Sequence, residues 1–191
     1  MPTIGVGEGT WPTLRRTLER AGIAESEFLT ECDASFKQGS RFDGWRDGAP
    51  DDRYYHPFMA PPAAETGDAI SLWRDLGGNM PFAPFVCSQP DICALDLAPR
   101  QRAMPDYAGA LNYAYHLDAA KLARLLTRHA TGRLGVRHVS DHVTQVRQHE
   151  DGDVAAVETR AHGAIEGDLF LDCTGHAALL IGGTYNVPFI V

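Results

Sequence analysis

The chain has 191 residues, of which 44% are apolar and 22% charged, and its formal net charge is −8. These values are ordinary for a globular protein of about one domain, and the acidic balance argues against nucleic acid or an anionic membrane surface as the main partner. No stretch approaches the roughly 18 apolar residues of a membrane span, and the N-terminus lacks a basic-then-apolar signal pattern, so we expect a cytoplasmic protein.

The N-terminal segment is rich in glycine and then becomes helical. The residues "IGVGEGTWPT" carry glycine at alternate positions, which is typical of a loop whose backbone approaches another group closely. Pro12 near the start, Leu14 and Leu18 one turn apart, and Gly22 as a stop predict a helix over 12–22. The segment 24–32 predicts a second, shorter helix.

The middle of the chain gives weaker signals. Residues 41–45 predict a strand. The following stretch, "DGAPDDRYYHPFMAPPAAE", is too rich in Pro, Asp and Gly for regular structure, yet it holds several aromatic residues. A long loop that carries aromatics is more often functional than a filler. We expect packed but irregular structure over 71–106.

The last third is better defined. Asp118 as N-cap, with Leu122, Leu125 and Leu126 on one face, predicts a helix that ends near Gly132. Apolar positions of period two at Val143 and Val157, with turn residues at 151–152 and 162–163, then predict short strands. The run "DLFLDCTG" predicts a buried parallel strand that meets a ligand at its C-terminal end.

Metal chemistry has little support in this sequence. The histidines His138 and His142 lie in strand-like sequence without a convincing carboxylate pattern, so we expect no metal site. The four cysteines lack metal-ligand spacing and fit a reducing cytosol; they are Cys32, Cys87, Cys93 and Cys173.

Lysine is rare in this chain, because Lys37 and Lys121 are the only two among 17 basic residues. A lysine amine near apolar neighbours can lose its proton and act as a nucleophile, whereas arginine stays charged. Lys37 lies in "ASFKQGSRFDGW", among aromatic residues. The alternative is an ordinary solvated lysine at a strand edge.

Five motifs together resemble the flavin-dependent tryptophan halogenases. They are "IGVGEGT", "ECDASFKQGSRFDGW", "YYHPF", "YAYHLD" and "DLFLDCTG", and their order and approximate spacing are similar to those of that family from about residue 4 to 189. The resemblance implies an α/β fold, part of the FAD-dependent monooxygenase-like (GR2-type) fold, with a mixed sheet, short antiparallel strands and surrounding helices. We expect one incomplete FAD-binding domain over 1–191, with an irregular substrate-side insertion over 46–108.

The family's full length is greater than this chain. The usual GxGxxG segment would precede "MPTIGVGEG", and the catalytic glutamate and remaining substrate pocket would follow "TYNVPFIV". The chain therefore resembles an internal fragment, and we expect it to be inactive alone and to self-associate. A non-catalytic remnant of a flavoprotein monooxygenase and a fragment of an aromatic hydroxylase are the alternatives.

The resemblance also implies a reaction. Reduced FAD, supplied by a separate flavin reductase, reacts with oxygen, and chloride or bromide is converted to hypohalous acid that acts on tryptophan or a related indole. Lys37 matches the lysine that hydrogen-bonds this oxidant or forms a haloamine with it. Arginine could not do the latter, because a protonated guanidinium has no lone pair to offer.

The remaining site residues follow from the same resemblance. His56 and Phe58 match an aromatic pair that faces the indole, with plain packing as the alternative. A flavin-binding strap is matched by Gly5, Gly7, Glu8 and Gly9, where Gly9 stands in place of the more usual alanine. Val143 matches a backbone contact to the adenine. An ordinary tight turn and a strand core residue are the respective alternatives.

Overall fold

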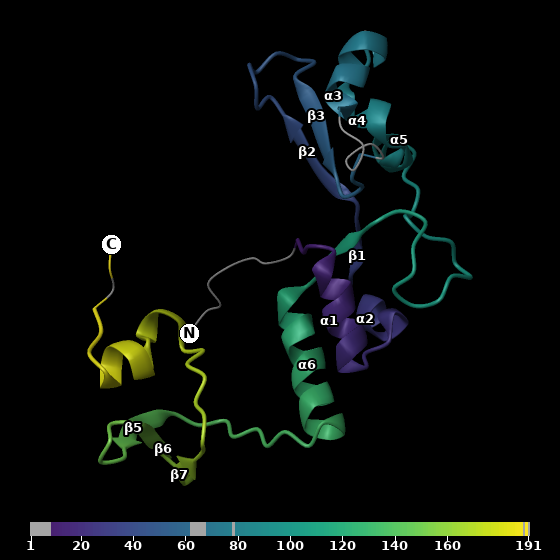
Figure 1. Cartoon of the computed structure of the whole chain (residues 1–191). Coiled ribbons are helices and arrows are strands. Elements are labelled where there is room, and N and C mark those ends of the chain that lie inside the picture. Colours follow the sequence, from purple (N-terminus) through teal and green to yellow (C-terminus); the bar gives the residue numbers. More distant parts are fainter. Residues whose placement is uncertain (1–8, 62–67, 78, 189, 191) are drawn as a thin grey trace. The chain divides into compact units, whose positions relative to one another are not determined.

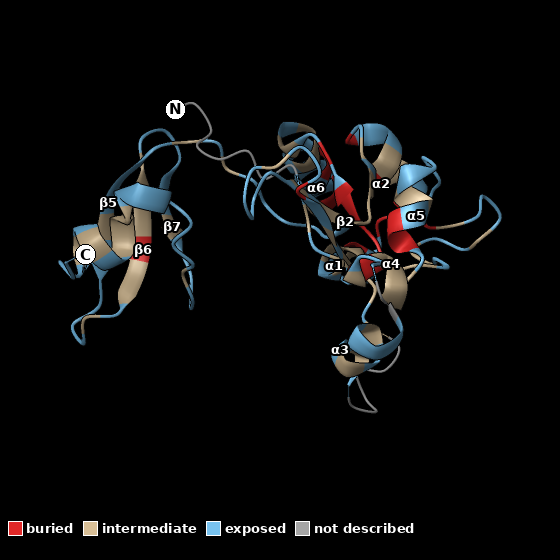
Figure 2. Cartoon of the chain, turned by 90° about the horizontal axis from the view of Figure 1, so that it is seen from above, coloured by how far each residue is buried: buried red, intermediate tan, exposed pale blue. Residues whose placement is uncertain are grey.

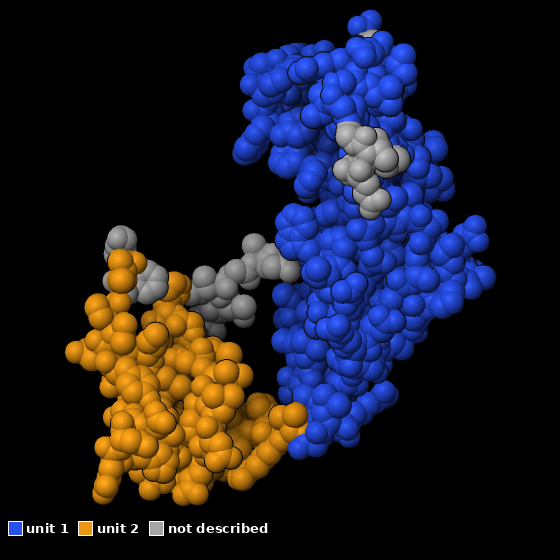
Figure 3. Space-filling model, in the orientation of Figure 1, with its two compact units in different colours: residues 1–135 blue, residues 136–191 orange. Residues whose placement is uncertain are grey.

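The computed structural model describes residues 9–61, 68–77, 79–188 and 190, and it has an α/β architecture. The chain divides into two compact units, residues 1–135 and residues 136–191 (Figure 3). Each unit is described by itself below. The expected extent of a single FAD-binding domain stays a prediction.

Three helices of the first unit lie together in Figure 1. They are α1 (Thr13–Ala21), α2 (Glu25–Glu31) and α6 (Ala119–Arg133). All three were predicted. Gly22 ends α1 in the left-handed conformation, with φ of 75°, which glycine adopts at little cost. Asp118 caps α6 by accepting a hydrogen bond from the backbone N–H of Lys121 at 2.9 Å.

The core of this unit forms where these helices meet strand β4 (Ala114–His116). Figure 2 shows buried residues among these helices, with others elsewhere in the unit. The helices contribute the fully buried Leu18, Phe28 and Leu125, while Leu126 of the predicted apolar face is 41% exposed. Burying apolar side chains of this size supplies most of the stabilising free energy of such a unit.

Two antiparallel strand pairs position the candidate site. Strand β1 (Ser35–Lys37) pairs with β4, and β2 (Gly39–Asp43) pairs with β3 (Arg53–Pro57). The prediction that "DGAPDDRYYHPFMAPPAAE" has no regular structure is therefore wrong for residues 53–57, which form β3. This strand is stabilised across the ladder, where Phe42 stacks on Tyr54 with ring centroids 4.9 Å apart.

The rest of residues 46–108 holds short helical segments that follow β3. Helices α4 and α5 pack against β3. The segments are α3 (Ala69–Leu72), the π-helical η1 (Trp73–Gly77), α4 (Phe82–Val86) and α5 (Gln89–Ala94).

The second unit contains an antiparallel sheet of β5 (Val143–Gln148), β6 (Val154–Thr159) and β7 (Gly163–Glu166). These strands and the turns between them were predicted. The α/β class with short antiparallel strands is thus confirmed, and every strand pair in the described residues is antiparallel.

The predicted buried strand at "DLFLDCTG" is wrong in this structure. Residues 168–174 form no strand, and Leu169 and Leu171 are 79% and 81% exposed. A strand needs a ladder partner for its backbone, and no strand of the described chain lies beside this segment. Two short helical segments follow, the 3₁₀ helix η2 (Gly175–Ala177) and the π-helical η3 (Leu179–Thr184).

Two further properties concern membranes and metals. Within the described ranges, no helix is both long and apolar enough to cross a bilayer. Across those same residues, no three His, Cys, Asp or Glu side chains cluster as metal ligands would.

Candidate active site

Lys37 occupies the end of β1, opposite Ala114 of β4. The preceding residue, Phe36, packs edge-on against Tyr113 with ring centroids 5.2 Å apart, and so anchors the strand in the core. Because successive side chains of a strand point to opposite faces, this anchoring turns Lys37 away from the core. The Lys37 side chain is half-buried.

The Lys37 amine faces two aromatic rings. Its Nζ lies 5.7 Å from the ring centroid of Trp11 and 5.6 Å from that of Phe58. The two rings are themselves 5.8 Å apart at 47°. Lys121, by contrast, forms an ion pair with Asp33 on the surface. The two lysines therefore occupy chemically different environments.

Gly9 lies against this amine. A β-carbon at Gly9 would be 3.3 Å from Lys37 Nζ and 3.7 Å from the ring of His116. Gly9 also pairs with His116 in an isolated antiparallel bridge. The absence of a side chain at position 9 thus leaves room for the lysine amine beside the histidine ring.

A cavity of about 400 Å³ opens beside Lys37. Its lining includes His56 and His116, so the structure brings Lys37 and His56 to the same space. Phe58 lines a neighbouring cavity of about 330 Å³, which also includes His56. The three residues predicted to act on the substrate are therefore close together, with His56 on the wall common to both cavities.

Gly39 permits the close approach of β2 to β3. Its φ is +155°, and a β-carbon there would lie 2.5 Å from the His56 carbonyl oxygen. Real side chains cannot come so near to a backbone atom, so only glycine fits. Gly39 therefore allows β2 to lie close to the backbone of His56.

A buried amide network fixes the segment that carries Phe58. Gln89, which is 1% exposed, accepts a hydrogen bond from the Met59 N–H at 2.9 Å and donates to the Asn112 carbonyl at 2.7 Å. The Asn112 side chain donates to the Phe58 carbonyl at 3.0 Å, and Arg15 donates to Asn112 Oδ1. These hydrogen bonds hold the segment that carries Phe58 and Met59 against Gln89 and Asn112.

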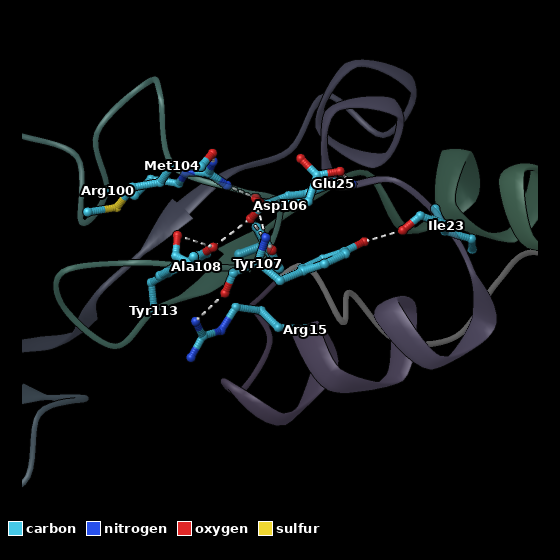
Figure 4. A network of polar contacts seen from close by, with 10 residues as sticks. Arg15, Ile23, Glu25, Arg100, Met104, Asp106, Tyr107, Ala108 and Tyr113 are labelled. Atoms are coloured by element: carbon cyan, nitrogen blue, oxygen red, sulfur yellow. Dashed lines mark hydrogen bonds and ion pairs between the residues drawn. The ribbon is translucent and has the colours of Figure 1, made fainter.

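Glu25 provides a buried carboxylate next to β4, and Figure 4 shows the polar network to which it belongs. Glu25, with no exposed surface, accepts hydrogen bonds from the hydroxyls of Tyr113 at 2.7 Å and Tyr115 at 2.6 Å. It also accepts from the Tyr107 N–H at 2.9 Å and forms an ion pair with Arg100. Burial raises the pKa of Tyr115, which keeps this phenol protonated and donating.

The residues predicted to contact flavin are only partly described. Gly5, Gly7 and Glu8 lie outside the described residues. Gly9 lies beside Lys37 in the first unit, and Val143 begins β5 in the second, where its side chain is 39% exposed.

Sequence reasoning missed several residues of this site. Trp11 directly follows the glycine-rich segment, and His116 lies within "YAYHLD", so a signal was present for both. Gln89 and Asn112 have no local signal, because their role depends on contacts with residues far away in the chain.

Comparisons with known proteins find relatives along almost the whole chain. The family model described as tryptophan halogenase matches residues 1–190. The chain is 36% identical to tryptophan 6-halogenase ThaL of Streptomyces albogriseolus, covering 100% of this chain and 38% of the relative. The chain therefore spans well under half the length of this relative.

Solved structures give the same result. The tryptophan halogenase of Shewanella frigidimarina NCIMB 400 has 45% identity and a TM-score of 0.90, with 100% of this chain and 37% of that chain covered. Tar14, a tryptophan C-6 flavin-dependent halogenase (chlorinase) from taromycin biosynthesis, has 32% identity and a TM-score of 0.88, with coverage of 100% and 39%.

Proposed function

The chain belongs to the tryptophan halogenase family, and on that premise we propose that it provides the halogenating lysine for chlorination or bromination of tryptophan or a related indole. The observation that carries the proposal is the position of Lys37. Its amine faces two aromatic rings and lies beside a cavity of about 400 Å³. Relatives named for tryptophan 6-halogenation and for flavin dependence support the substrate class and the cofactor.

FAD in its reduced form would supply, with oxygen and halide, the hypohalous acid for this reaction. A flavin reductase is the proposed source of the reduced cofactor. Gly5, Gly7, Glu8 and Gly9 are proposed to contact the flavin, and the backbone at Val143 its adenine. These assignments rest on the family and not on described contacts.

Lys37 would receive the oxidant. In its neutral form the amine has a lone pair, so it can take the halogen from hypohalous acid and release water, or it can hold the acid by a hydrogen bond. Either route keeps a reactive halogen in one place and away from other side chains. The rings of Trp11 and Phe58 limit the directions from which the amine can be approached.

His56 and Phe58 would orient the flat substrate. Ring-on-ring contacts of this kind contribute roughly 0.5–1.5 kcal/mol beyond area burial. The cavity that both residues line is the proposed location of the indole. Gly39 and the Gln89 network would maintain the position of this pair.

The test places this chain within a full-length member of the family. Residues 4–189 would replace the matching part of a full-length relative, which would then receive reduced FAD, oxygen, chloride and tryptophan. Lys37→Arg keeps the charge and approximate length, yet we expect halogenated product to fall by about two orders of magnitude or more. Consumption of reduced flavin by oxygen should continue, because that step does not use the amine.

Lys121→Arg is the matched control, since Lys121 is the only other lysine and is paired with Asp33. It should leave the product yield unchanged. Halogenation by Lys37→Arg at the parental rate would overturn the proposed role. A hydroxylated product would instead favour the aromatic hydroxylase alternative.

A further inference from the structure

Trp11 places an indole of the chain itself beside the proposed halogen carrier. The Lys37 Nζ lies 5.7 Å from the centroid of the Trp11 ring. The Trp11 side chain is 63% exposed, so a small oxidant in solution can reach it. Indole is also the class of ring on which the proposed function would act.

We propose that Trp11 is a self-halogenation site that receives halogen from Lys37. This inference rests on the proposed function. In the first step the Lys37 amine and hypochlorous acid give a chloroamine and water. In the second step a C–Cl bond forms at an indole carbon of Trp11 while the N–Cl bond breaks, and the displaced ring proton returns to the amine. The net change is Trp11–H and HOCl going to Trp11–Cl and water.

The choice of Trp11 follows from proximity. Reactions between groups held close together gain a large effective concentration over the same groups in solution. Phe58 lies equally near the amine, but a phenyl ring is much less electron-rich than an indole and does not compete. A cation over a ring is also attracted most strongly by tryptophan, which maintains the approach of Lys37.

The other two tryptophans, Trp45 and Trp73, allow the chlorination of Trp11 to be compared with that of rings that lie away from Lys37. Trp45 is 73% exposed and packs on Phe42, with ring centroids 5.7 Å apart. Trp73 donates its indole N–H to the Met80 carbonyl at 2.7 Å. Neither ring has a lysine amine over it among the residues that the structure describes. Exposure alone would therefore favour Trp45 over Trp11, whereas transfer from Lys37 would favour Trp11.

The test treats the chain with hypochlorous acid and needs no flavin. Because the four cysteines and four methionines react first, about ten equivalents of oxidant are required. Trypsin places the three tryptophans in three separate peptides, 1–15, 42–46 and 54–74, so the chlorine isotope pattern can be measured at each one. We expect Trp11 to be chlorinated at least about fivefold more than Trp45.

Two variants test whether the chlorination of Trp11 depends on the Lys37 amine. Lys37→Arg should lower chlorination of Trp11 at least about fivefold and leave Trp45 unchanged, and Lys121→Arg should alter neither. Acetylation of the folded wild-type chain, which removes the nucleophilic amine without a mutation, should reproduce the loss at Trp11. This second measurement covers the case in which Lys37→Arg fails to fold.

Equal chlorination of Trp11 in the wild-type chain and Lys37→Arg would overturn the proposal, as would preferential chlorination of Trp45. These outcomes are distinct from failure of the proposed function. Chemical oxidant bypasses the flavin reaction, while the graft experiment measures product from added tryptophan.

Discussion

Glu25 lies outside the candidate site, but its contacts reach the strand pair that carries Lys37. It is completely buried, and its carboxylate accepts hydrogen bonds from Tyr113 and Tyr115, the two residues that flank Ala114. Ala114 is the ladder partner of Lys37. The buried charge is thus linked to the lysine through one strand pair, and its contacts keep β4 in a single position.

Glu25→Gln should therefore destabilise the chain substantially. The substitution leaves Arg100, whose side chain is 11% exposed, without its charged partner, and breaking a buried ion pair costs about 3–5 kcal/mol. Urea unfolding followed by circular dichroism measures the change in the free energy of unfolding.

Glu27→Gln on the same helix is the control for this prediction. Glu27 forms a surface pair with Arg128 at 3.7 Å, so its loss should cost less than about 1 kcal/mol. Equal effects of the two substitutions would show that Glu25 is not an essential buried charge.

The residues of the site differ in how well the sequence predicts them. Lys37, His56 and Phe58 could be proposed from motif resemblance, and the structure brings them together around neighbouring cavities. Gln89 and Asn112 could not, because their contribution comes from contacts with residues distant in sequence. Motif resemblance identifies residue types at given positions, but not the packing that surrounds them.

At the scale of elements, the sequence predicted correctly those helices whose ends are set by residues close to them in the chain. The N-cap Asp118 and the stop at Gly22 each act within a few residues, and the helices that they bound were predicted. Strand β3 was missed because its conformation depends on pairing with β2. The segment "DLFLDCTG" failed for the same reason, because strand composition gives no strand without a partner.

The hairpin of β2 and β3 depends on Asp52 at its turn. One oxygen of this buried carboxylate accepts hydrogen bonds from the backbone N–H groups of Arg46, Asp47 and Gly48, at 2.7, 2.7 and 3.0 Å. These bonds, that of Asp47 foremost, lower the pKa of Asp52. The hairpin carries His56, so this turn contributes to the geometry of the candidate site.

The lowered pKa gives a defined dependence of stability on pH. The contribution of Asp52 is fully present above the pKa of the unfolded state, about 3.9, and is lost as pH falls through the lower folded value. Asp52→Asn should reduce stability at pH 7 and should also flatten the decline of stability below about pH 4. Urea midpoints measured from pH 7 to pH 2.5 test both effects.

Asp51→Asn provides the comparison for Asp52, because Asp51 is its exposed neighbour. We expect the urea midpoints of this variant to follow those of the parent chain across the same pH range. If the urea midpoint of Asp52→Asn falls with pH as steeply as that of the parent chain, other carboxylates cause the acid sensitivity.

At the scale of the whole molecule, we expect exposed apolar residues of the second unit to promote association between chains. Leu169 and Leu171 are 79% and 81% exposed and lie two residues apart in a segment that pairs with no described strand. Exposed apolar side chains next to unpaired backbone favour association with another chain. We therefore expect the apparent mass of the protein to rise with concentration.

Replacing both residues, as Leu169→Ser with Leu171→Ser, should weaken this association at least about tenfold, because burying a leucine contributes roughly 1.5–3 kcal/mol. The control is Leu134→Ser with Val136→Ser, which removes two residues of the same spacing that are 60% and 51% exposed. Sedimentation velocity between about 1 and 100 μM resolves the two cases. A monomer at every concentration would contradict the prediction, and an equal effect of both double variants would mean that general surface hydrophobicity, not this segment, drives association.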